Sequence, residues 1–356
     1  MQDKHNLLKN IRIFIFSLTL SIVGIQFSRS ISPLAVVDDS SIFLAWLPLC
    51  VMFSVLFLFG RRGIVPIILA MMATNHWNLH LPLMQAAVLL FCQTFSVLGI
   101  CGIVRWQVGA RWRHGLPDRN IWLRIFWLGF VAPAGIKASM YLAGHCLDYP
   151  VAISTFFGTA TIIYTIVDIL SLISAVLIFT MLFYYPLRMI INPRYCRIFW
   201  RRDIAPYLVK EKRLFTLTWI SVVVALIVLM CAPFDADYIA GYLVPVFFIV
   251  FTLGVGKLSY PLLNLSWAIS ALCLLVYNRN FLQGVGSEYS LAFILSVLIS
   301  FSICLLYMVC IYQRSEWLNR QWHDQALTDP LTRLPNIRAL EQFLLQGTGQ
   351  TVCCLR

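Results

Sequence analysis

Long apolar segments alternate with short polar ones along almost the whole chain. A helix needs about 20 apolar residues to cross a bilayer, and ten segments approach or reach that length. They are residues 11–27, 42–59, 64–74, 83–104, 121–143, 159–183, 214–232, 239–255, 260–277 and 289–312. The third segment is short and contains Pro66, so it is tilted, re-entrant or extended. We therefore predict an all-α fold, a polytopic transmembrane bundle of about ten spans, over residues 1–312.

The composition agrees with a membrane domain. The residues are 60% hydrophobic and 12% charged, whereas soluble domains are about half apolar and about a quarter charged. The net charge of +12 comes from basic residues in the loops. All but three of the 27 lysines and arginines lie in the N-terminal flank, in alternate loops or in the tail; the exceptions are Arg29, Lys137 and Arg279. By the positive-inside rule, both termini are cytoplasmic, and we expect a lipid bilayer and no nucleic acid as the partner.

Two ionisable residues, Lys137 and Asp168, lie inside apolar segments. An unpaired charge in the middle of a membrane costs a few kcal/mol or more. The two residues are on consecutive antiparallel segments at similar depth from the outer face, so we predict an ion pair between them. One interpretation is a static contact that fixes helix packing. The other is a switch or ligand contact in a cavity that opens to the outside.

His76 and His80 are a second candidate site at the outer face. Their spacing of four would place both rings on one face of a helix, as metal ligands can be placed. No carboxylate is adjacent, and Pro82 limits the length of a helix here. The alternative is an interfacial belt, where amphipathic rings gather, and we assign no metal site.

The last apolar segment continues without glycine or proline as far as Pro330. This pattern predicts a helix that leaves the membrane and continues through a cytoplasmic connector, residues 313–328. Ile311, Leu318 and Trp322 fall on one face of it, which favours a homodimer through the connector.

A short motif follows the connector. Its residues are Ala326, Asp329, Leu331, Thr332, Leu334 and Asn336. They match the opening of a GGDEF domain, the diguanylate cyclase module of cyclic-di-GMP signalling, which this stretch resembles. The resemblance implies that residues 329–356 are the N-terminal part of a truncated α/β GGDEF domain. Arg333 and Ile337 depart from the family pattern, which implies a degenerate domain.

The apolar part of the chain also resembles a known family. Residues 43–49 and 240–246 are similar to segments of MASE-type sensors in enterobacterial MASE–GGDEF–EAL proteins, which are inner-membrane cyclic-di-GMP phosphodiesterases. The resemblance implies a bacterial inner-membrane sensory module that responds to an unknown small ligand or membrane cue.

The chain carries neither a GGDEF loop nor an EAL signature. We therefore assign no catalytic residue and expect no activity from the chain alone. Mg²⁺ or Mn²⁺ is expected only for the catalytic domains. The alternative function is a ten-helix transporter with a short cytoplasmic tail. The GGDEF-like opening distinguishes the two, because a transporter does not need it.

Overall fold

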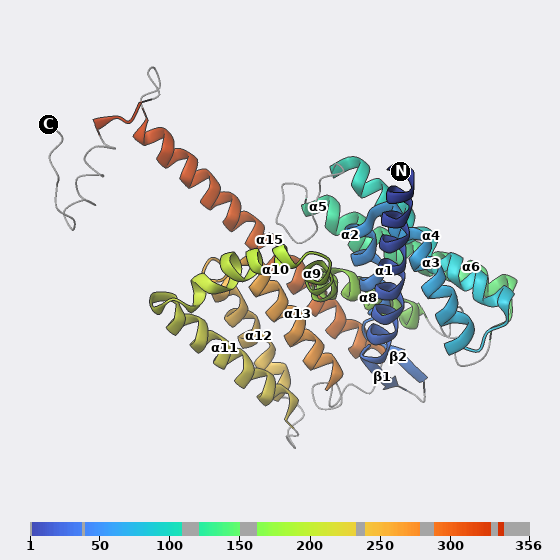
Figure 1. Ribbon diagram of the computed structural model, residues 1–356. Helices are drawn as coiled ribbons and strands as arrows, with labels where there is room; N and C mark the ends of the chain where they lie inside the picture. Colours follow the sequence, from blue (N-terminus) through green and yellow to red (C-terminus); the bar gives the residue numbers. More distant parts are fainter. Residues whose placement is uncertain are drawn as a thin grey trace.

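The computed structural model (Figure 1) is a bundle of helices with one small β-hairpin. It describes residues 2–37, 40–108, 121–149, 162–232, 239–277, 288–328 and 334–337. Seven helical stretches in this part of the chain are long and apolar enough to cross a membrane. They are Asn10–Ser30, Pro48–Trp77, Leu83–Gln107, Ile121–Cys146, Ile162–Ile191, Lys212–Cys231 and Tyr289–Leu327. Two shorter apolar helices are Leu243–Gly254 and Tyr260–Val276. The all-α polytopic fold is confirmed, and the number of crossings stays a prediction.

The first helix, α1 (Gln2–Ser30), leads into an antiparallel hairpin of β1 (Leu34–Val37) and β2 (Ser40–Phe43). Ala35 pairs with Ile42, and both are buried, whereas Val36 is exposed. The strands therefore alternate between an inner and an outer face. The predicted segment 42–59 begins too early, because Ile42 and Phe43 belong to β2 and the helix starts at Pro48.

The stretch from Pro48 to Trp77 is folded back on itself. It contains α2 (Pro48–Phe59), a 3₁₀ turn at Gly60–Gly63, α3 (Ile64–Ala73) and a π-helical turn at Thr74–Asn78. Phe59 packs edge-on against Phe16, and Val51 contacts Gly24, so α2 runs antiparallel to α1. Gln26 Nε2 donates to Thr74 Oγ1 at 3.3 Å, so α3 returns to the end of α1 where the hairpin lies.

The next two helical runs pack through small residues. They are α4 (Leu83–Val108) and a run of α5 (Ile121–Arg124), a π-helical stretch at Ile125–Val131 and α6 (Ala132–Cys146). Ser139 Oγ donates to the Cys92 carbonyl at 3.1 Å, and Cys92 Sγ donates to the Ser139 carbonyl at 3.3 Å. Gly135 lies against Ser96. Small residues allow such close approach between membrane helices, where polar side chains can also bond across the interface.

A long run then crosses the middle of the molecule. It consists of α8 (Ile162–Ser174), a π-helical turn at Ala175–Phe179 and α9 (Thr180–Ile191). Cys50 Sγ donates to the Ala175 carbonyl at 3.0 Å, and Ser54 Oγ donates to the Thr180 carbonyl at 3.4 Å. These contacts hold α2 against the run. Short helical pieces follow: α10 (Pro193–Phe199), a π-helical turn at Trp200–Ile204 and a 3₁₀ turn at Ala205–Leu208.

The remaining helices are α11 (Lys210–Cys231), α12 (Ile239–Gly254), α13 (Tyr260–Val276) and α15 (Glu288–Leu327). They lie beside one another on the side of the bundle away from α1 (Figure 1). Trp267 Nε1 donates to Ser302 Oγ at 2.8 Å, and the Phe248 and Phe301 rings stack with centroids 3.7 Å apart. α15 has 40 residues and continues to Leu327, so the predicted uninterrupted helix is confirmed.

Gly60 makes the reversal between α2 and α3 possible, and its replacement tests this fold. Its φ of +63° is a conformation that L side chains rarely adopt, and the Arg105 guanidinium lies where a Cβ would be. We predict that Gly60→Ala lowers the free energy of unfolding by about 1–3 kcal/mol, measured by thermal unfolding of the full chain in detergent. Gly99→Ala is the control, because no atom lies within 4 Å of its Cβ position. Equal melting temperatures for Gly60→Ala and the unaltered chain would contradict the prediction.

Candidate functional site

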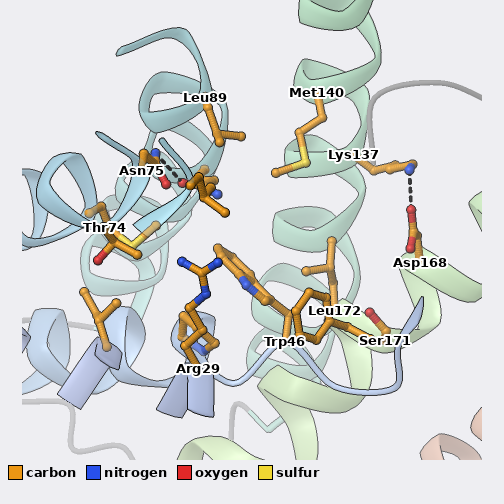
Figure 2. Close-up of a pocket in the computed structure, with 16 residues that line it drawn as sticks. Arg29, Trp46, Thr74, Asn75, Leu89, Lys137, Met140, Asp168, Ser171 and Leu172 are labelled. Carbon is orange, nitrogen blue, oxygen red and sulfur yellow. Dashed lines mark hydrogen bonds and ion pairs between the residues drawn. The ribbon is translucent and has the colours of Figure 1, made fainter. Parts of the chain in front are cut away.

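A cavity lies at the end of the bundle where the β-hairpin sits, between α1, α3, α4, α6 and α8 (Figure 2). We call it the hairpin-end cavity. Its volume is about 100 Å³, well above the roughly 10–15 Å³ that one water needs. Its polar lining residues are Arg29, Thr74, Asn75, Gln93, Lys137, Asp168 and Ser171. The rest of the lining is largely apolar, so the cavity can hold a small molecule with both polar and apolar parts.

Lys137 and Asp168 form an ion pair in the wall of this cavity. Lys137 Nζ lies 2.5 Å from Asp168 Oδ2, and the two residues are 4% and 5% exposed. α6 supplies the lysine and α8 the aspartate, and the two side chains point toward each other in Figure 2. The structure thus brings together the two charges that the sequence places inside the membrane. In a low dielectric, removal of either partner leaves a buried charge without compensation.

The opposite wall carries a chain of amide side chains. Asn75 Nδ2 donates to Gln93 Oε1 at 3.2 Å and to the Ala86 carbonyl at 3.5 Å. Asn75 is buried at the start of the π-helical turn that ends α3, and Gln93 is buried on α4. The hydrogen bonds hold the two amides in fixed orientations beside the cavity, as buried polar groups require.

Arg29 and Trp46 complete the cavity at the hairpin. Arg29 is half-buried near the end of α1, and its guanidinium points into the cavity (Figure 2). The segment that bears Trp46 is held at both ends. The Leu44 amide donates to the Pro33 carbonyl at 2.9 Å, and the Leu47 amide donates to Ser32 Oγ at 3.2 Å. These two hydrogen bonds hold the backbone on either side of Trp46.

His76 and His80 do not share a helix face. The π-helical turn ends at Asn78, and His80 has a left-handed backbone with φ +53°. The two rings therefore do not share a helix face, because the helix ends between them, and the alternative of an interfacial belt stays a prediction. His76 Nδ1 lies 2.8 Å from the Leu81 carbonyl oxygen, which accepts the hydrogen bond when the ring hydrogen is on Nδ1. No group of three metal-ligating side chains occurs among the described residues.

Part of the GGDEF-like motif is visible at the end of α15. Asn336 Nδ2 donates to the Ala326 carbonyl at 2.7 Å, and the Asn336 amide donates to the Leu327 carbonyl at 2.8 Å. Asn336 therefore satisfies carbonyls at the helix end. Leu334 is exposed. Asp329, Leu331 and Thr332 lie outside the described residues, so the motif stays a prediction.

Comparison with known proteins assigns the membrane part of the chain. The family model MASE1 matches residues 15–316, a range that contains every residue of the hairpin-end cavity. The chain belongs to the MASE1 family. It is therefore a membrane sensory domain, and this assignment favours the sensor over the transporter alternative. No solved structure matches this MASE1 domain.

Two curated relatives are similar over nearly the whole chain. One is "Probable cyclic di-GMP phosphodiesterase PdeA" of Escherichia coli K12, 64% identical over 353 residues, which cover 99% of this chain and 48% of that protein. The other is "Cyclic di-GMP phosphodiesterase PdeF" of the same organism, 24% identical over 347 residues, which cover 92% of this chain and 44% of that protein. The chain spans about half the length of the curated relatives that it matches.

Four residues of the hairpin-end cavity, Arg29, Trp46, Asn75 and Gln93, are not among the candidate site residues predicted from the sequence. The sequence contains a signal for one of them. Arg29 is one of the three basic residues outside the basic side of the predicted topology, so its position alone marks it for attention. Trp46, Asn75 and Gln93 carry no comparable signal. Their proximity depends on how α3 and α4 meet the hairpin.

The buried ion pair makes a quantitative prediction. Lys137→Met and Asp168→Leu each leave one buried charge unpaired, and each should lower the free energy of unfolding by about 3–5 kcal/mol. The double variant should lose much less stability than the sum of the two single losses, because it leaves no unpaired charge behind. Reversible unfolding of the three variants in detergent measures this coupling.

Arg320→Gln is the matched control. It breaks the exposed contact between Arg320 and Glu316, whose N–O distance is 3.6 Å, and should cost under about 1 kcal/mol. Strict additivity of Lys137→Met and Asp168→Leu would contradict a coupled pair.

Proposed function

We propose that this chain is the sensory input module of a cyclic-di-GMP signalling protein whose catalytic domains follow α15. The observation that carries the proposal is the single helix that joins the sensory bundle to the start of the GGDEF-like motif. The MASE1 match and the two phosphodiesterase relatives support it. In this proposal the hairpin-end cavity receives the signal and α15 transmits it. The chain itself contributes no catalytic residue, and Mg²⁺ or Mn²⁺ belongs to the catalytic domains.

The proposed orientation places the hairpin-end cavity on the outer side of the bacterial inner membrane. The far end of the bundle is basic: Arg61 and Arg62 lie beside the first part of α1, and Arg105 lies at the same turn. The N-terminus and the projecting end of α15 lie toward that basic end, and the hairpin lies at the other (Figure 1). The positive-inside rule then makes both termini cytoplasmic.

α8 provides a direct mechanical route from the cavity to α15. Asp168 and Ser171 of α8 line the cavity, and α8 packs extensively along α15. α15 also contacts the run that leads to α6, where Trp122 and Tyr307 lie with ring centroids 5.6 Å apart. A helix is stiff along its axis, so a shift of α8 would move the far end of α15.

Residues of two cytoplasmic-end turns lie close to α15 where it leaves the bundle. The Tyr312 ring lies against Gly256, whose φ of +79° and missing Cβ allow the approach. Ser259 Oγ donates to the Asp203 carbonyl at 2.9 Å, which joins the turn after α12 to the π-helical turn at Trp200–Ile204. The pKa of Tyr207 is raised, first by burial and then by electrostatic interaction with Asp203, Glu316 and Tyr312. The end of α15 in the bundle is therefore close to Gly256 and Tyr207.

From about Ile311 onward, α15 continues as an exposed helix. Ile311, Leu318 and Trp322 are 49%, 38% and 68% exposed, and they fall at offsets of 0, 7 and 11. Exposed apolar side chains on one face of a projecting helix favour pairing with a second copy. We therefore extend the proposal to a homodimer through the connector, residues 313–328.

The transmission proposal predicts that output depends on the rotational phase of α15. The chain is fused through its last residue to the remaining half of PdeA, and residues are inserted after Arg320. Two inserted residues rotate the downstream part by about 200°, whereas seven restore the phase to within about 20°. We expect two residues to change phosphodiesterase activity at least severalfold and seven to leave it nearly unchanged.

Two controls accompany this measurement. The chain without the fused half should hydrolyse no cyclic-di-GMP, because it contributes no catalytic residue in this proposal. Equal activity of the two-residue, seven-residue and unaltered fusions would contradict rigid transmission through α15.

The orientation is tested by labelling in cells. In a chain whose 11 native cysteines are replaced by alanine, Val36→Cys lies on the exposed face of β1 and Ser315→Cys on exposed α15. A membrane-impermeant maleimide, applied to cells with a permeabilised outer membrane, should label Val36→Cys. It should label Ser315→Cys only after the inner membrane is opened. The reverse pattern would overturn the orientation.

A further inference from the structure

The hairpin-end cavity is lined by more cationic than anionic side chains. Arg29 and Lys137 are cations, and Asp168 is the single carboxylate among the described lining residues. Asp168 is already paired with Lys137. The Arg29 guanidinium forms no ion pair within the described part of the chain, so one positive charge there is available to a ligand.

The amide wall also presents donors to the cavity. Gln93 Oε1 accepts from Asn75 Nδ2, so its carbonyl end is used and its NH₂ group is the end available to a ligand. The guanidinium offers N–H groups in a planar fork that matches a carboxylate. Arg29 and Gln93 therefore both offer donors to an acidic group in the cavity.

The remaining walls are apolar and include the aromatic rings of Phe43 and Trp46. Ile25, Met71, Leu89, Met140 and Leu172 line the cavity beside Trp46. A bare inorganic anion would leave these walls without a partner. A ligand with a small hydrocarbon body and one acidic group would satisfy both the walls and the guanidinium.

We propose that the hairpin-end cavity binds a small organic monocarboxylate, with Arg29 holding the carboxylate and Trp46 and its apolar neighbours holding the body. Arg29 is half-buried at the hairpin end of α1, so it reaches both solvent and cavity. The assignment names the ligand class of the sensory function proposed above and rests on it.

Calorimetric titration of the full chain in zwitterionic lipid nanodiscs tests the site, with sodium benzoate as the probe. Benzoate should bind at one site per chain, and benzamide, its uncharged analogue, should bind at least about tenfold more weakly. Arg29→Gln should weaken benzoate binding at least about tenfold. Absence of benzoate binding, or equal binding of benzamide, overturns the assignment.

Matched variants separate binding from folding. Arg12→Gln removes an exposed arginine from the other end of α1 and should bind benzoate as the unaltered chain does. Arg29→Lys keeps the charge but loses the planar fork, so its affinity should lie between those of the unaltered chain and Arg29→Gln. Leu172→Phe narrows the cavity without a change of charge and should also weaken binding. Unchanged affinity in both Arg29→Gln and Leu172→Phe overturns the site.

A second titration distinguishes a soluble carboxylate from a lipid headgroup. Nanodiscs that contain anionic phosphatidylglycerol should give the same benzoate affinity. Loss of benzoate binding there would assign the guanidinium to a lipid phosphate and overturn the proposal. The phase dependence of the fused phosphodiesterase reports on the sensory function independently. A failure to bind benzoate with phase dependence intact therefore removes the ligand class alone.

Discussion

The ion pair between Lys137 and Asp168 is the contact on which the arrangement of this membrane domain depends. A charge in a membrane interior must be paired, hydrated or neutralised, and here each residue is the partner of the other. The pair joins α6 to α8 and fixes the depth at which they face each other. α6 in turn packs on α4 through Cys92 and Ser139, and α8 packs along α15. A change at the pair therefore bears on both halves of the bundle.

The two ends of the bundle differ in their polar groups. The hairpin-end cavity collects its polar side chains at one end, and the basic residues gather at the other. α15 leaves at the basic end and carries the GGDEF-like motif. In the proposed function, a signal received in the cavity passes through α8 to α15 and past the contact of Tyr312 with Gly256. α8 and α15 pack directly against each other, which is the contact that this route requires.

The sequence predicts the parts of this structure that depend on local pattern. The uninterrupted α15 follows from the absence of glycine and proline, and the two membrane charges are evident because apolar segments contain so few. The hairpin is missed because Ile42 and Phe43 are apolar and continue into an apolar helix. The spacing of His76 and His80 does not place both rings on one helix face, because the helix ends at Asn78. The cavity depends on three-dimensional approach of α1, α3 and α8, to which the sequence contributes only the unusual position of Arg29.

Distance measurement between α15 and α10 tests most directly whether the cavity is coupled to the output helix. Spin labels at Ser315→Cys and at the native, exposed Cys196, with the other cysteines replaced, report the position of α15 relative to the bundle. Asp168→Asn removes the negative partner of Lys137 but keeps the shape of the side chain. We predict that this variant remains folded and has a shifted distance distribution. Superimposable distributions for the folded variant and the unaltered chain would contradict the coupling.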